Sequence, residues 1–171
     1  MIITSDLRHK AQCYYGASDP KKILRVLLAD GTSANVHYRL ARFFQRIKLG
    51  IIGWFILDLN RLFNGCVIGR NADFGPGLVF MHPIGVVING GVKGGKNIVI
   101  ESGVVIGAAR NGIPAKVPVL GDDIFIGAGA KVLGGIRIGN NVRIGANAVV
   151  VHDVPDGATV VGIPARVVKK G

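Results

Sequence analysis

Two patterns of hydrophobic positions divide the chain near residue 65. Upstream, residues 20–48 place apolar side chains at the spacing of helix faces. This pattern breaks at residues 30–33, where Asp30 and Ser33 are candidate N-caps for a second helix. Downstream, glycine and β-branched residues dominate and charged residues become sparse. We therefore expect an N-terminal helical region over residues 1–64 and a unit of different architecture over residues 65–171.

The second unit repeats its hydrophobic positions every six residues. The repeat runs without a break through Leu120, Ile126, Val132, Ile138, Ile144 and Val150. The fifth position of each of these units is again small or aliphatic. Earlier units keep the interval in other phases, with two residues inserted between Phe80 and Ile88 and a gap at Gly94. Residues 107–119 interrupt the repeat, and we expect them to form an extruded loop.

A period of six matches neither an amphipathic helix nor the simple alternation of a β-hairpin. It matches a β-solenoid, in which each unit forms one face and one corner of a prism and three units make a coil of about eighteen residues. In such a coil the first and fifth positions of each unit point inward, whereas the third position points outward. We therefore expect a β-solenoid over residues 65–171.

His82 lies at the third position of the unit that begins at Phe80. Polar residues occupy the same slot in other units, at Arg70, Lys96, Ser102, Asp122 and Asn140. We therefore expect His82 on the surface, where a neutral imidazole is able to remove a proton from an attacking hydroxyl. His152 occupies the same slot in the segment VHDVPDG, which is typical of a final corner and turn. His9 and His37 fall in the helical region, where solvated or packing roles are expected.

Three segments together carry a family resemblance. They are residues 119–168, the segment HPIGVVI at 82–88, and the segment NVHYRLARFF at 35–44. Together they resemble the serine acetyltransferase-like group of hexapeptide-repeat transferases, which includes relatives that act on surface polysaccharides. The resemblance implies a left-handed parallel β-helix, a homotrimer or a dimer of trimers, and direct acetyl transfer from acetyl-CoA to a hydroxyl, with His82 as general base and no metal.

The resemblance also implies where coenzyme A binds. The pantetheine arm would follow a groove between neighbouring β-helices, past small residues at Gly107, Ala108, Ala128 and Ala146. The adenine and phosphates would lie toward the last coil, near Gly162, Pro164, Arg166 and Lys169. Cationic side chains at this end suit a phosphate ligand.

Four positions depart from the group's pattern. Met81 stands where the group has an acid before the histidine, and Val67 aligns with a second acid that orients the histidine. Lys116 and Val117 align with the arginine and histidine that contact serine. Ser102, about one coil above the histidine, is a candidate replacement partner. These changes favour a different hydroxyl acceptor, such as a sugar of a surface polysaccharide pathway.

Two other functions remain open at this point, and a third is disfavoured. A serine O-acetyltransferase of cysteine biosynthesis keeps the chemistry and changes the acceptor. A non-catalytic trimeric scaffold on the same fold would explain the missing carboxylates. A zinc carbonic anhydrase requires three histidine ligands, whereas the repeat region contains only His82 and His152, so this class is disfavoured.

Charge and cysteine content indicate which classes of binding partner and which cellular compartment to expect. The net charge of +11 is spread along the chain without interleaved aromatic residues, which disfavours nucleic-acid binding. Residues 42–63 combine basic side chains, an apolar stretch and the one tryptophan, which suggests either peripheral membrane contact or a packing surface. The N-terminus lacks a signal-peptide pattern, and the two cysteines, Cys13 and Cys66, match no disulfide or metal spacing. We therefore expect a cytoplasmic protein.

Overall fold

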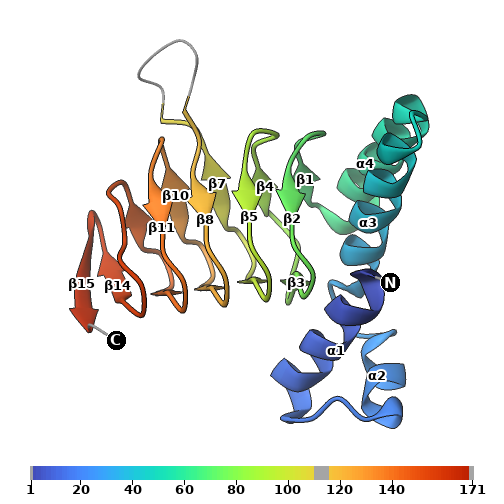
Figure 1. Cartoon of the computed structure of the whole chain (residues 1–171), viewed down its shortest axis with the longest axis horizontal. Helices are drawn as coiled ribbons and strands as arrows, with labels where there is room; N and C mark the ends of the chain where they lie inside the picture. The colour runs from blue at the N-terminus through green and yellow to red at the C-terminus, as the bar shows by residue number, and fades with distance from the viewer. Residues whose placement is uncertain (1, 110–115, 170–171) are drawn as a thin grey trace.

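The computed structural model describes residues 2–109 and 116–169, which form a helical arm followed by a solenoid of short strands (Figure 1). The helical arm consists of α1 (Ile2–Tyr15), α2 (Pro20–Val26), α3 (Thr32–Arg46) and α4 (Gly50–Asn64). Asp19 caps α2 by accepting a hydrogen bond from the Lys22 backbone N–H at 3.1 Å. The N-cap of α3 is Gly31, with no side-chain cap bond, so the expectation that Asp30 or Ser33 caps this helix is wrong.

The strands form three parallel sheets, which are the three faces of a prism. The first sheet contains β1 (Val67–Ile68), β4 (Val87–Ile88), β7 (Val105–Gly107), β10 (Lys131–Leu133) and β13 (Val149–Val150). The second contains β2 (Asp73–Phe74), β5 (Lys93–Gly94), β8 (Val119–Leu120) and β11 (Arg137–Ile138). The third contains β3 (Val79–Phe80), β6 (Val99–Ile100), β9 (Phe125–Ile126), β12 (Arg143–Ile144), β14 (Thr159–Gly162) and, antiparallel to it, β15 (Ala165–Lys169).

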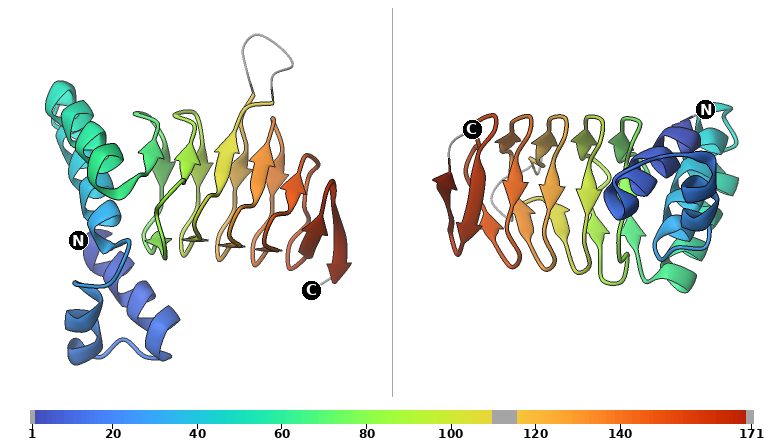
Figure 2. Two further views of the ribbon diagram at one scale, coloured as in Figure 1. Left: turned by 180° about the vertical axis from the view of Figure 1, so that it is seen from behind. Right: turned by 90° about the horizontal axis from the view of Figure 1, so that it is seen from below.

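From β1 to β13, consecutive strands pass from one face to the next, and every third strand pairs with its equivalent one coil away (Figures 1 and 2). Phe80 of β3 pairs with Ile100 of β6, and Ile100 pairs in turn with Ile126 of β9. The six-residue repeat therefore corresponds to one face and one corner, and the chain forms a parallel β-helix. The connection between β7 and β8 is residues 108–118, so the expected loop over 107–119 is shorter by one residue at each end, and residues 110–115 lie outside the described part of the chain.

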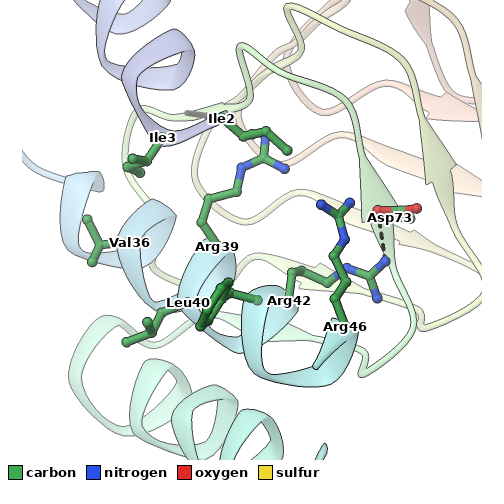
Figure 3. Close-up of a pocket in the computed structure, with 9 residues that line it drawn as sticks. Ile2, Ile3, Val36, Arg39, Leu40, Arg42, Arg46 and Asp73 are labelled. Carbon is green, nitrogen blue, oxygen red and sulfur yellow. Dashed lines mark ion pairs between the residues drawn. The ribbon is translucent and has the colours of Figure 1, made fainter. Parts of the chain in front are cut away.

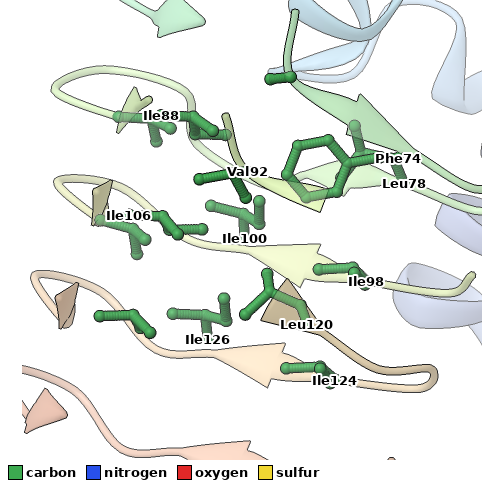
Figure 4. Packing of buried hydrophobic residues seen from close by; sticks show 14 of the residues in the cluster. Phe74, Leu78, Ile88, Val92, Ile98, Ile100, Ile106, Leu120, Ile124 and Ile126 are labelled. Atoms are coloured by element: carbon green, nitrogen blue, oxygen red, sulfur yellow. The ribbon is translucent and has the colours of Figure 1, made fainter. Parts of the chain in front are cut away.

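The interior of the prism is filled by the first and fifth positions of the repeat. Ile88, Ile106, Ile100 and Ile126 stack in columns along the axis (Figure 4), and each is at most 1% exposed. The gap in the pattern at Gly94 has a steric cause, because a Cβ atom there would overlap the ring of Phe74. The two-residue insertion after Phe80 is accommodated at the surface, where Ile84 is 72% exposed.

A buried ion pair attaches the helical arm to the first coil. Asp6 of α1 accepts bonds from Arg39 Nε at 2.7 Å and Nη2 at 3.0 Å, and from the backbone N–H groups of Gly77 and Leu78. Arg39 of α3 also donates to the carbonyl of Phe74 at 2.8 Å. Burial raises the pKa of Asp6, although Arg39 and the backbone donors oppose that rise. This cluster fixes α1 and α3 against the corner between β2 and β3.

Two further polar side chains of α3 dock on the same end of the prism. Asn35 donates from Nδ2 to the carbonyl of Leu78 at 2.8 Å and accepts from the N–H of Phe80 at 3.2 Å. The Tyr38 hydroxyl donates to the Ala72 carbonyl at 3.1 Å. The arm therefore covers the open end of the coil and satisfies backbone groups that no further strand pairs with. Among the described helices, none is long and apolar enough to cross a membrane.

Candidate functional site

His82 lies in the turn that follows β3, and its side chain is 57% exposed, as its outward slot predicts. Its Nδ1 atom lies 2.8 Å from Oδ2 of Asp30, which is 52 residues earlier in the chain and also 57% exposed. Asp30 belongs to the turn between α2 and α3. The docking of the helical arm on the first coil therefore brings a carboxylate to the candidate base.

The turn that carries Asp30 is held against β3 by a buried lysine. Lys10 of α1 is 1% exposed and donates from Nζ to the backbone carbonyls of Asp30 and Phe80, the latter at 3.0 Å. Burial lowers the pKa of Lys10 to about 8, and the charge of Asp30 partly opposes this. Next to Asp30, Gly31 packs directly on the Phe80 carbonyl, where a Cβ atom would overlap the oxygen.

The register of the third sheet arranges a column of residues along one corner of the prism. Phe80, Ile100, Ile126, Ile144 and Val160 are aligned by strand pairing. The residues two positions after these form a column that we call the His82 edge: His82, Ser102, Ala128, Ala146 and Gly162. The first four lie at successive levels of the corner between the third and first sheets, and Gly162 is the last residue of β14.

Backbone hydrogen bonds run along the His82 edge from coil to coil. The Gly129 N–H donates to the Ser102 carbonyl at 2.7 Å, and the Asn147 N–H donates to the Ala128 carbonyl at 2.8 Å. Ala128 is half-buried and Ala146 is exposed. The structure therefore gives His82 and three of the predicted coenzyme residues one shared edge, with small residues between His82 and the last coil.

The other predicted coenzyme residues lie elsewhere. Gly107, at the end of β7, and the adjacent Ala108 are at the corner between the first and second sheets, one face away from the His82 edge. Pro164 is in the turn between β14 and β15, and Arg166 pairs with Val161 beside that turn.

Lys169, the last predicted coenzyme residue, pairs with Thr159 at the far end of β15. Lys116 and Val117, aligned with serine contacts, precede β8 at the corner that carries Gly107. Within one copy of the chain, the residues at the Gly107 corner and Lys169 therefore do not lie together with His82.

Asp30 is the side chain that the structure places at hydrogen-bond distance from His82. The described hydrogen bond of the imidazole goes to Asp30, so the sequence hypothesis that Ser102 replaces the missing carboxylate is not supported. Ser102 does lie one coil above His82 on the same edge, as expected. The sequence identified Asp30 only as a candidate helix cap, because no local spacing connects a turn in the arm with a corner of the solenoid.

Tyr14 and Glu101 also lie near this site. Lys10 Nζ lies 5.9 Å from the centroid of the Tyr14 ring. Burial raises the pKa of Tyr14, and the negative charges of Asp30 and Glu101 raise it further. Glu101 is level with Met81 in the strand register, so a carboxylate stands one coil above the position where the resembled group has its acid.

The remaining histidines contact backbone carbonyls away from this edge. His152 is exposed at the corner between the first and second sheets, with Nδ1 2.9 Å from the Val151 carbonyl. His9 and His37 place Nδ1 2.6 Å and 2.7 Å from the carbonyls of Gly77 and Ser33. Over residues 2–109 and 116–169, no group of three His, Cys, Asp or Glu side chains is arranged to hold a metal ion.

A separate pocket of about 330 Å³ lies between α1 and α3 (Figure 3). Its apolar wall includes Ile3 and Leu40. Arg39 and Arg42 also line it, but both are engaged: Arg39 with Asp6, and Arg42 with Asp73 at 2.9 Å. None of the predicted site residues lines this pocket, so it is distinct from the His82 edge.

Comparison with known proteins gives the family. Residues 118–152 match the family described as "Bacterial transferase hexapeptide (six repeats)". A serine acetyltransferase of Helicobacter pylori is 39% identical over 145 residues, which span 85% of this chain and 85% of that protein. The chain belongs to the serine acetyltransferase group of hexapeptide-repeat acyltransferases.

Other members of the group are longer than this chain. The serine acetyltransferase of Synechococcus elongatus is 42% identical over 146 residues, and the match covers 85% of this chain but only 60% of that protein. A solved structure described as a serine acetyltransferase complex with CoA superposes with a TM-score of 0.81 at 27% identity, covering 96% of this chain and 68% of the other.

Proposed function

We propose that this protein is an O-acetyltransferase that transfers the acetyl group of acetyl-CoA directly to a hydroxyl acceptor, with His82 as general base. The observation that carries the proposal is the His82 edge, where an exposed imidazole paired with a carboxylate begins a column of small residues. Membership of the serine acetyltransferase group supports acetyl transfer. We also propose that the β-helix is left-handed, as in that family. We propose a cytoplasmic location as well, which the free thiols of Cys13 and Cys66 support.

In the proposed mechanism, His82 acts through Nε2. Its Nδ1–H donates to the Asp30 carboxylate, so the neutral ring has its lone pair on Nε2. Nε2 takes the proton of the acceptor hydroxyl while the hydroxyl oxygen forms a bond to the thioester carbonyl carbon. The tetrahedral intermediate then collapses, the carbon–sulfur bond breaks, and the protonated imidazole returns the proton to the departing coenzyme A thiolate.

Coenzyme A would lie along the His82 edge toward the last coil. Ala128, Ala146 and Gly162 leave the backbone of this edge accessible to an extended pantetheine chain. Arg166 is exposed beside the last of these residues and supplies a cation for a phosphate. A relative solved as a complex with CoA supports this ligand.

Assembly into a homotrimer would complete the site. Gly107, Ala108 and Lys116 lie one face away from the His82 edge in the same chain. A neighbouring copy packed against the first sheet would place its own Gly107 corner opposite the His82 edge of this chain. The separation of the predicted residues over two corners therefore supports an oligomeric enzyme, with a trimer or a dimer of trimers as the expected forms.

The acceptor is either serine or a sugar hydroxyl. The relatives' names favour serine. The apolar side chains of Val67, Met81 and Val117, which stand where the group has polar residues, favour a different acceptor such as a sugar of a surface polysaccharide pathway. Glu101 and Asp30 provide carboxylates near the same end of the site, and both acceptor classes have donors for them.

Calorimetric titration with coenzyme A tests the cofactor. Binding to the wild type is expected, and Ala146→Tyr should weaken it at least tenfold because the ring obstructs the His82 edge. Lys96→Tyr places the same side chain at the equivalent slot of another corner and should leave affinity unchanged. If wild-type protein does not bind coenzyme A, a non-catalytic scaffold becomes the better account.

Thiol release from acetyl-CoA then separates the acceptors. The panel includes L-serine, homoserine and free or nucleotide-linked sugars, each at matched concentration. Preferential turnover of L-serine would assign the chain to serine O-acetylation, whereas preferential turnover of a sugar would assign it to the polysaccharide branch. Absence of turnover with every acceptor would count against the proposed activity.

A further inference from the structure

We propose that Asp30 is the positioning residue for His82, holding its imidazole in the Nδ1–H tautomer with Nε2 directed to the acceptor. This inference rests on the proposed function of His82. Asp30 is in the helical arm, outside the repeat, and Val67 and Met81 occupy the two positions where the resembled group has acids. The chain therefore keeps a carboxylate at the base but supplies it from a different element.

The contact itself fixes the roles of its two atoms. Oδ2 of Asp30 lies 2.8 Å from Nδ1 of His82, a normal distance for a charge-assisted hydrogen bond. An ionised carboxylate only accepts hydrogen bonds, so Nδ1 must carry the proton. In the neutral ring the other nitrogen, Nε2, is then the only basic site, and this is the nitrogen the proposed mechanism requires.

The surrounding contacts fix both ends of this pair to β3. Lys10 bonds the carbonyls of Asp30 and Phe80, the residue two positions before His82. Gly31, with φ of 77°, permits the turn to lie directly on the Phe80 carbonyl. Asn35 donates to the carbonyl of Leu78, which precedes β3, and accepts from the N–H of Phe80 in that strand. The backbone of the turn that carries Asp30 is therefore fixed to β3 by Lys10 and Gly31, and Asn35 fixes the start of α3 beside it.

The solvent exposure of the pair limits the size of its effect. Both side chains are 57% exposed, so water competes for the hydrogen bond. Outer carboxylate partners of metal-ligating histidines are typically worth about 10- to 100-fold in activity, and we expect an effect of the same order for the partner of a histidine base. We therefore expect a reduction in this range when the Asp30 carboxylate is removed, no larger than the reduction expected on removal of the base itself.

The test compares Asp30→Ala and Asp30→Asn with wild type by ¹⁵N NMR of the imidazole and by steady-state kinetics. In neutral wild-type His82 the nitrogen shifts should report a protonated Nδ1. In Asp30→Ala they should move toward the Nε2–H form that free imidazole side chains prefer in water. Asp58→Asn, which removes an exposed aspartate of α4, should leave the His82 spectrum unchanged.

The steady-state kinetics should show that Asp30 affects catalysis only when His82 is present. Asp30→Ala and Asp30→Asn should lower kcat about 10- to 100-fold while KM for acetyl-CoA changes less than about twofold. In a His82→Ala background, Asp30→Ala should cause no further loss. Thermal unfolding midpoints measured beside the rates identify any loss that comes from unfolding.

Two results would overturn the role of Asp30. One is a wild-type ring already protonated on Nε2, and the other is an Asp30→Ala variant with unchanged nitrogen shifts and unchanged kcat. Because the nitrogen shifts need no substrate, they test the contact even where no acceptor is acetylated. If His82 is in the Nδ1–H tautomer but no acceptor is acetylated, the result contradicts the proposed function and leaves the contact with Asp30 intact.

Discussion

Gly31 packs so closely on the carbonyl oxygen of Phe80 that a Cβ atom at residue 31 would overlap it. The φ of Gly31 is 77°, in the left-handed region that other residues rarely adopt. The turn that carries Asp30 therefore reaches β3 because residue 31 has no side chain. One glycine thus connects the packing of the helical arm with the geometry of the candidate base.

Replacement of Gly31 by alanine should disturb this contact and lower acetyl transfer. Gly16 is the matched control, because its φ of 67° is also left-handed but nothing lies within 4 Å of the position that a Cβ atom would occupy. Gly16→Ala should cost about 1 kcal/mol of unfolding free energy from backbone strain alone. Gly31→Ala should cost at least about 2 kcal/mol more, measured by urea unfolding. Equal losses in the two variants would mean that the contact with Phe80 is unimportant.

The ring of Phe74 fills the space that the missing side chain of Gly94 leaves in the core. Phe74→Ala should lower the unfolding free energy by about 3–5 kcal/mol through the cavity it opens. Gly94→Ala should cost about 1–3 kcal/mol through overlap with the ring. Because the two residues share one space, the double variant should lose less unfolding free energy than the two single variants lose together. Additive losses in urea unfolding would contradict this packing.

The ion pair of Asp6 and Arg39 should be a major attachment of the helical arm. Asp6→Asn leaves the Arg39 guanidinium buried without its carboxylate, which should cost about 3–5 kcal/mol of unfolding free energy. The control is Asp58→Asn, which breaks an exposed pair with Arg61 and should cost about 1 kcal/mol or less. A loss for Asp6→Asn no greater than for Asp58→Asn would refute a structural role for the buried pair.

Because Lys10 is buried, the free energy of unfolding should depend on pH in a specific way. Burial lowers its pKa from 10.5 to about 8, so between these values the unfolded chain binds a proton that the folded chain has released. The free energy of unfolding should therefore rise with pH across this window, by up to about 3 kcal/mol relative to Lys10→Met. Both proteins should carry Cys13→Ser, because burial also raises the pKa of that thiol.

Urea unfolding at several pH values between about 7.5 and 10 makes this comparison. The control is the Lys10→Met protein, whose stability should lack the additional rise. A wild-type stability that falls relative to Lys10→Met over the same window would have the opposite sign from that expected of a buried lysine.

The solenoid could be predicted from the sequence because its restraint is local and repeated. Each unit places an inward residue at its first and fifth positions, so Ile100 and Val104, for example, repeat the burial of Ile126 and Ala130 one coil away. The outward slot of His82 followed from the same count. Even the irregularity at Gly94 was visible as a gap, although the ring that fills it was not.

The partner of His82 could not be predicted in this way. Asp30 and His82 are 52 residues apart and belong to elements with different periods, so no spacing connects them. Their contact depends on how the helical arm docks, which Lys10 and Asn35 determine through backbone carbonyls and N–H groups of β3. Side chains that bond to backbone groups carry little signal in a hydrophobic pattern, and so the sequence suggested only a helix cap for Asp30.

The rate of free-thiol release from acetyl-CoA in His82→Ala, with the best acceptor of the panel, tests the central claim most directly. The matched control is His152→Ala, which removes an exposed histidine from the same repeat slot at another corner. We expect His82→Ala to lower kcat by at least about 100-fold with coenzyme A affinity retained, and His152→Ala to match wild type. Wild-type turnover by His82→Ala would contradict the assignment of His82 as the general base.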